Sequence, residues 1–265
     1  MFEFAFMQRA LGAALLIGLV GGVLGFFVVL RRLAFLGVGI SHAALGGVAI
    51  GVLLGVSPLV CGGAAGLAVA LLVARSSQSG LIAEDTAIGV FFSGTLALGI
   101  ALASARPGAQ QDLFGYLFGN VLAIAPAELA LLALLALGVL AALAFCFEPL
   151  LFASFDPEIA DAYGVPVAGL HALLLALIAA TAVIGMRVVG VLLVEAMLVI
   201  PAATAALWSL HYRSQLGLAA ALGVASTAGG LVLGYHFDVA PGAGAVLLAC
   251  AAFALSFAVR GRRRA

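Results

Sequence analysis

Long apolar runs dominate this chain, and they lie at residues 10–30, 35–55, 58–74, 86–105, 124–147, 168–186, 188–209, 215–235 and 241–259. A helix needs about 20 apolar residues to cross a bilayer, and these runs do not alternate as the strands of a membrane β-barrel do. Only 8% of the residues are charged, against about a quarter in soluble domains. We therefore predict an all-α, polytopic transmembrane helical bundle of about 8–9 spans, forming one domain over residues 1–265.

The arginine positions predict which loops face the cytoplasm, because short cytoplasmic loops are enriched in positive charge. If nine spans alternate from an external N-terminus, the cytoplasmic basic residues are Arg31, Arg32, Arg75, Arg213, Arg260 and Arg262 to Arg264. Arg106 and Arg187 then fall on the external side. An eight-span arrangement with a cytoplasmic N-terminus and one re-entrant segment stays open.

The residue types that are missing exclude several functions. All eleven basic residues are arginine, so the lysine of a P-loop is absent and another chain must hydrolyse ATP if ATP is used. The three cysteines are far apart and form no CxxC motif, which argues against a disulfide framework or a thiolate metal site. Since HExxH and GxSxG are also absent, we expect neither an enzyme nor a bound cofactor.

Two ionisable residues lie inside predicted spans, where such groups are costly and therefore candidates for function. They are His42, in GVGISHAALGG, and Glu195, in VVGVLLVEAMLVIPAATA. Imidazole and carboxylate groups bind transition metals, so both are candidates for a metal translocation path. His42 could instead bond to a neighbouring helix, and Glu195 could be protonated or face water.

Other polar residues lie near the predicted span ends. His236 and Asp238, in GYHFDVAPGAG, form a possible external site where ions first meet the protein. His171 and His211 are expected at the membrane interface. The helix macrodipole alone explains Glu84 and Asp85 at the start of a span, and Asp112, Tyr116 and Asn120 are assigned to an external or re-entrant stretch.

A polar stretch at residues 148–169 predicts a short helix on the cytoplasmic surface. Asp156 followed by Pro157 is typical of an N-cap and a first helical residue. Gly164 ends the turn, and Pro166 follows it. The stretch is either an ordinary solvated loop or a docking helix for a partner.

Six motifs in order along the chain resemble the zinc/manganese/iron (ABC-3 type) ABC transporter permease family. They are VVLRRLAFLGVGISHAALGGVAIG (28–51), EDTAIGVFFSGTLALGI (84–100), DLFGYLFGNVLAI (112–124), FDPEIADAYGV (155–165), RVVGVLLVEAMLVIPAATA (187–205) and FDVAPGAGAVLL (237–248). The resemblance implies a bundle like those of type II ABC importers. The chain would be the permease subunit of an ATP-driven importer for a divalent metal, with zinc first and manganese or iron as alternatives.

The resemblance also implies the surroundings of the chain. It would lie in the bacterial cytoplasmic (inner) membrane and pair with a second permease copy. Its partners would be a cytosolic ABC ATPase and an extracytoplasmic metal-binding protein, with no nucleic acid. Residues 155–165 would be the coupling helix, with Asp156, Glu158, Ala160 and Gly164 contacting the ATPase.

One position departs from the family pattern. The family usually has Asp four residues before the histidine, and this chain has Val38 there. Glu195 stands where the family usually has Ser or Thr, so we hypothesise that it supplies the missing carboxylate. The rival functions are a siderophore, haem or cobalamin permease, an ATP-independent cation transporter and, more remotely, an intramembrane enzyme.

Overall fold

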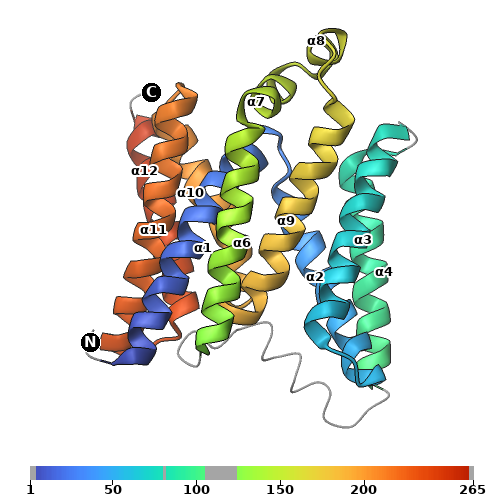
Figure 1. Ribbon diagram of the computed structural model, residues 1–265. Helices are drawn as coiled ribbons and strands as arrows, with labels where there is room; N and C mark the ends of the chain where they lie inside the picture. Colours follow the sequence, from blue (N-terminus) through green and yellow to red (C-terminus); the bar gives the residue numbers. More distant parts are fainter. Residues whose placement is uncertain (1–3, 80–81, 105–123, 263–265) are drawn as a thin grey trace.

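The computed structural model describes residues 4–79, 82–104 and 124–262. Within these ranges, nine helices are long and apolar enough to cross a membrane, as the apolar runs predict. They are α1 (Ala5–Leu30), α2 (Ala34–Leu54), α3 (Pro58–Ser79), α4 (Glu84–Ser104), α6 (Pro126–Phe145), α9 (Val167–Val189), α10 (Val191–Trp208), α11 (Tyr212–Phe237) and α12 (Pro241–Arg262). Two shorter helices, α7 (Phe147–Phe155) and α8 (Pro157–Ala162), project from one end of the bundle (Figure 1).

The end of the bundle that carries α8 is the cytoplasmic end. Arg31, Arg32, Arg75, Arg213 and Arg260 lie at this end, following the up-and-down course of the helices. Arg9 and Arg187 lie at the opposite end. This asymmetry is the one that the positive-inside rule describes, and it agrees with nine spans and an external N-terminus.

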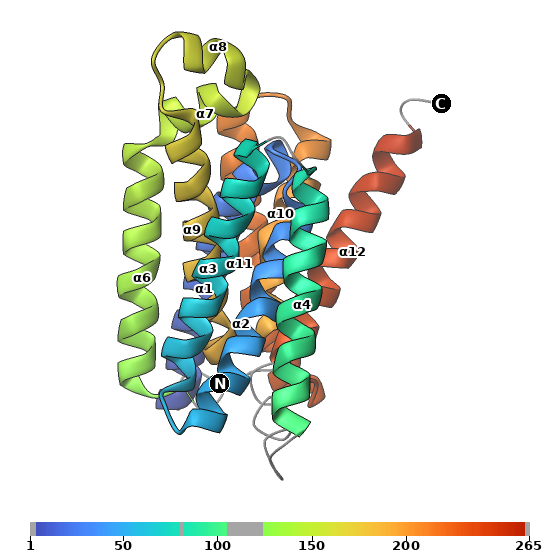
Figure 2. The same ribbon diagram turned by 90° about the vertical axis from the view of Figure 1, so that its right-hand side faces the viewer.

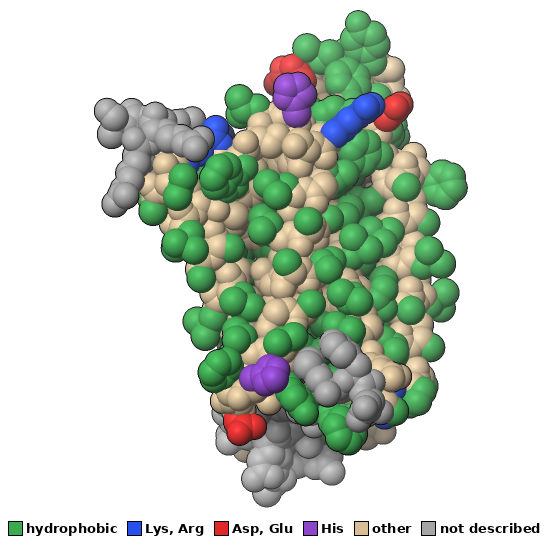
Figure 3. Space-filling view, turned by 90° about the vertical axis from the view of Figure 1, so that its left-hand side faces the viewer, with side chains coloured by type: hydrophobic (Ala, Val, Ile, Leu, Met, Phe, Trp, Pro, Cys, Tyr) green, Lys and Arg blue, Asp and Glu red, His purple; other side chains and the backbone are tan. Residues whose placement is uncertain are grey.

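Helices α1, α2, α9 and α10 form the interior of the bundle, whereas α4, α6 and α12 lie at its edges (Figure 2). Large side chains of α1 such as Phe26 and Phe27 are fully buried, and Phe145 at the end of α6 is 89% exposed. Figure 3 shows a broad hydrophobic surface between two ends where the charged and histidine side chains gather. Such a surface suits contact with lipid on the sides of the bundle.

Glycines that recur at four-residue intervals let the inner helices approach one another closely. A Cβ atom added at Gly22 of α1 would lie 2.5 Å from the carbonyl oxygen of Ala219 in α11. Gly47 and Gly51 of α2 meet α3 in the same way, at Cys61 and Pro58. These contacts fix α2, and with it His42, at the centre of the bundle.

The polar stretch after α6 contains more helix than the sequence predicts. The chain turns at Cys146 and begins α7, in which Pro149 occupies the first turn. Proline is tolerated there because its missing N–H group would have no partner in that turn. The predicted short helix follows as α8, with Asp156 as its N-cap and Pro157 as its first residue.

Candidate functional site

His42 of α2 and Glu195 of α10 lie against each other. Nδ1 of His42 is 3.3 Å from Oε1 of Glu195, and their side chains are 25% and 14% exposed. The structure therefore brings together the two intramembrane residues that the sequence singles out, although 153 positions separate them in the chain. Neither side chain is completely buried, and an ion path requires such partial exposure.

The backbone and a neighbouring ring orient His42. Its Nδ1 atom is 2.9 Å from the carbonyl oxygen of Val38, one turn earlier on α2. Because a carbonyl can only accept, Nδ1 carries the proton in this arrangement, and Nε2 of the neutral ring carries the lone pair. The ring of Phe92 on α4 packs edge-on against the imidazole, with 5.3 Å between the ring centroids.

The Glu195 carboxylate is incompletely satisfied. Its Oε1 atom is buried and has no hydrogen-bond partner, and the same is true of the Ser41 hydroxyl beside His42. An unpaired carboxylate oxygen inside a bundle is costly. A cation between Oε1 and Nδ1 would satisfy it, provided that the ring proton has moved to Nε2.

The spacing of the two groups fits one shared ion. Transition metals lie about 2.1 Å from nitrogen and oxygen ligands, so a separation of 3.3 Å corresponds to a ligand–metal–ligand angle of about 104°. Within the described residues, no group of three His, Cys, Asp or Glu side chains could hold a metal ion. Two side chains alone would make a sparse site, and sparse sites are the kind from which an ion can leave again.

The residues predicted at the external end are separate from this pair. His236 and Asp238 are exposed where α11 ends, and the His236 ring packs edge-on against Tyr235. Asp238 adopts a left-handed backbone conformation with φ of 54°. Asp112, Tyr116 and Asn120 lie outside the described residues.

Helix α8 has the predicted local structure. Oδ1 of Asp156 accepts a hydrogen bond from the backbone N–H of Ile159 at 3.0 Å, and Gly164 ends the turn with φ of 80°. Ala160 is fully buried beneath the helix, whereas Ile159 and Tyr163 are 49% and 80% exposed. The apolar residues of α8 therefore divide, with Ala160 packed inward and Ile159 and Tyr163 on the exposed surface.

A second histidine–carboxylate pair escaped the sequence reasoning. His171 of α9 is 7% exposed, so its side chain is buried among the helices near the cytoplasmic end of the bundle. Its Nε2 atom is 3.1 Å from Oε1 of Glu84 at the start of α4. Spacing could not reveal this contact, because it joins helices that are distant in the chain.

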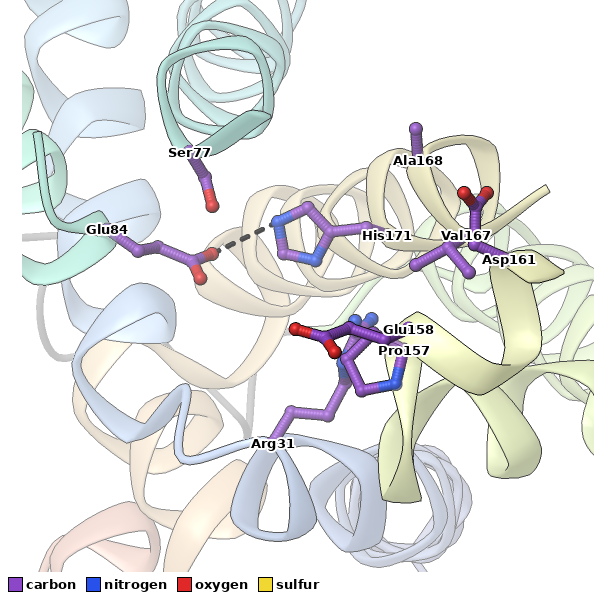
Figure 4. Close-up of a pocket in the computed structure, with 9 residues that line it drawn as sticks. All are labelled: Arg31, Ser77, Glu84, Pro157, Glu158, Asp161, Val167, Ala168 and His171. Carbon is purple, nitrogen blue, oxygen red and sulfur yellow. Dashed lines mark ion pairs between the residues drawn. The ribbon is translucent and has the colours of Figure 1, made fainter. Parts of the chain in front are cut away.

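The second pair lines a cavity of about 410 Å³ beneath α8. Arg31, at the end of α1, lines the same cavity. Burial lowers the pKa of Arg31, and the nearby Glu84 carboxylate opposes that shift. Figure 4 shows Glu84 and His171 pointing toward each other, with Glu158 of α8 on the side of Arg31.

The chain is similar to known transport proteins over almost its whole length. The ABC 3 transport family matches residues 3–260. The manganese transport system membrane protein MntC of Halalkalibacterium halodurans is 40% identical over 255 residues, which are 96% of this chain and 87% of that protein. The manganese import system permease protein ScaB of Streptococcus gordonii is 38% identical over 262 residues, which are 99% of this chain and 94% of that protein.

A solved structure gives the same match in three dimensions. It is PsaBC from Streptococcus pneumoniae in complex with Fab, and the matched chain is 38% identical with a TM-score of 0.84. The match covers 96% of this chain and 92% of that one.

Proposed function

The chain belongs to the ABC 3 transport family of membrane permeases, and we propose that it carries Mn²⁺ into a bacterial cell as the permease subunit of an ATP-driven importer. The observation that carries this proposal is the His42–Glu195 pair, 3.3 Å apart inside the membrane-spanning bundle. We assign these two side chains to the translocation path, where they would share the cation during its passage.

We propose manganese as the transported ion, whereas the prediction from the sequence named zinc first. Both cited relatives are named for manganese. The local chemistry is compatible with Mn²⁺, since the Glu195 carboxylate and water are oxygen ligands that suit this ion, although the imidazole of His42 also suits zinc and iron. Within the described residues, no cysteine joins His42 and Glu195 in a group of three metal ligands, and Cys250 is exposed.

The His42–Glu195 pair would bind the cation after the ring proton of His42 moves from Nδ1 to Nε2. In the structure, Nδ1 of His42 faces both the Val38 carbonyl and the Glu195 carboxylate. An arriving ion would take the position between Nδ1 and Oε1, and the ring proton would then lie on Nε2. Water would complete the shell, so that binding stays weak enough for release.

The partners follow from what this chain lacks and what it exposes. It has no lysine for a P-loop, so a cytosolic ATPase would bind and hydrolyse ATP. Helix α8 would dock on that ATPase through its exposed cytoplasmic surface, with Asp156, Glu158 and Gly164 in the coupling segment. Ala160, predicted from the sequence to be among the contacting residues, is instead buried beneath the helix and would support this surface from inside. An external binding protein would deliver the ion, and a second permease copy would complete the path.

The test is Mn²⁺ uptake by proteoliposomes that contain the permease with its ATPase. We expect ATP-dependent accumulation in the wild type and its loss in His42→Ala. His211→Ala is the matched control, since His211 is exposed at the cytoplasmic end of α11 and its removal should leave uptake unchanged. Uptake without ATP would instead indicate a secondary transporter, and wild-type uptake by His42→Ala would remove this residue from the path.

A further inference from the structure

The cavity beneath α8 is a second place where a histidine and a carboxylate meet. Its lining comes from the ends of α1 and α3, the starts of α4 and α9, and helix α8. Three carboxylates line it, from Glu84, Glu158 and Asp161, against the single guanidinium of Arg31. Three carboxylates against one guanidinium give the cavity net negative charge, which favours a cation.

The polar atoms of this cavity lack sufficient partners. The His171 side chain is 9% exposed, and neither of its ring nitrogens has a hydrogen-bond partner. Oε1 of Glu84 is also buried without one, although it lies 3.1 Å from Nε2 of His171. Nε2 and Oε1 form an ion pair with each other, which leaves Nδ1 of His171 as the atom without any partner. Since buried polar groups normally find partners, this arrangement has room for a ligand.

The spacing of the pair fits a metal ion. For a cation about 2.1 Å from each ligand, the 3.1 Å between Nε2 and Oε1 gives an angle of about 95°. This is close to the right angle between neighbouring ligands of an octahedral ion. The cavity of about 410 Å³ also leaves room for several coordinated waters, each of which occupies about 30 Å³.

We propose that His171 and Glu84 bind a divalent transition-metal cation at the cytoplasmic end of the bundle, in a site distinct from the His42–Glu195 pair. Water completes the coordination, and Glu158 and Asp161 of α8 add negative charge across the cavity. A bound ion ties the start of α4 to the start of α9 directly beneath α8. A cation bound from the cytoplasm would thereby restrain the motion of α8, the segment that would contact the ATPase.

The experiment titrates Mn²⁺ into the tag-free permease–ATPase complex in nanodiscs, without nucleotide, and follows free Mn²⁺ by its paramagnetic resonance signal. All samples carry His42→Ala, which removes the path site. We expect the His42→Ala complex to retain one bound Mn²⁺ per permease. Adding His171→Ala or Glu84→Gln should weaken this binding at least about tenfold.

The control adds His211→Ala, which removes an exposed cytoplasmic histidine outside the cavity and should leave binding unchanged. Glu84→Gln keeps the shape of the side chain, and co-elution of the ATPase reports that the complex is intact. Retained binding in either cavity variant, or an equal loss in the control, would overturn the proposal. Uptake assays judge the His42–Glu195 pair separately, so failure of one proposal is distinguishable from failure of the other.

Discussion

Moving the carboxylate from α10 to α2 tests whether Glu195 is a metal ligand. Glu195→Gln keeps the side-chain shape and removes the charge that lies 3.3 Å from Nδ1 of His42. A double variant, Val38→Asp with Glu195→Gln, places a carboxylate one turn before His42 on the same face of α2. Val38 is only half-buried, so the bundle has space for this change.

The expected loss follows from the geometry. A carboxylate about 2.1 Å from a divalent ion, at an effective dielectric constant of 20, attracts it by about 16 kcal/mol. Dehydration of the ion and the carboxylate offsets most of this attraction. If only a tenth survives, Glu195→Gln weakens binding by about 1.6 kcal/mol, or roughly 15-fold. The double variant should recover most of that loss.

The assay is Mn²⁺ uptake by proteoliposomes at a series of Mn²⁺ concentrations, with protein amounts matched. Glu195→Gln should raise the concentration for half-maximal uptake, and the double variant should lower it again. Glu148→Gln, which changes a cytoplasmic carboxylate of α7, is the control and should match the wild type. Unchanged uptake by Glu195→Gln would refute the role of this carboxylate.

Three further predictions concern the scaffold. Asp156→Ala removes the N-cap of α8, which costs that helix about 1 kcal/mol of stability, and should reduce ATP-dependent uptake. Asp156→Asn keeps an N-cap and should retain uptake, so equal uptake by the two variants would contradict this prediction. Gly22→Val should cost about 1–3 kcal/mol of stability by overpacking, whereas Gly138→Val, where a Cβ meets nothing within 4 Å, should leave the melting temperature near the wild-type value. The partly exposed pair of Glu128 and Arg187, 2.9 Å apart, should contribute less than about 1 kcal/mol, so a large drop in melting temperature for Glu128→Gln would show that it does more.

The fold was predictable from the sequence because the bilayer imposes a strong length rule. Each span must hold about 20 apolar residues, and each predicted run coincides with a long helix of the structure. Helix α8 was predictable for a different reason, since Asp156 and Pro157 specify its first turn locally. Both signals are contained in short stretches of chain.

Contacts between helices were less accessible to sequence reasoning. Glu84 at the start of α4 is sufficiently explained by the helix dipole, and His171 near the start of α9 looks interfacial. Only the packing of α9 against α3, together with the contact from the start of α4, shows that the two side chains form a pair. The His42–Glu195 contact could be anticipated because this chain has Val38 where the family usually has Asp, and it has Glu195 inside a span without an obvious partner.

The placement of the carboxylate on α10 has a consequence for transport. If an Asp at position 38 of α2 supplied the carboxylate, the imidazole and the carboxylate would lie on one helix and keep their spacing as the bundle moves. In this chain the pair bridges α2 and α10 at 3.3 Å, and one ion can span two ligands only up to about 4.2 Å. A relative shift of about 1 Å between these helices, small for alternating access, would therefore release the ion. The affinity of the wild type for Mn²⁺ should accordingly differ between the nucleotide-free and ATP-trapped complexes, and the Val38→Asp, Glu195→Gln variant should show a smaller difference in the same titration. An equal difference in both proteins would mean that release depends on other parts of the path.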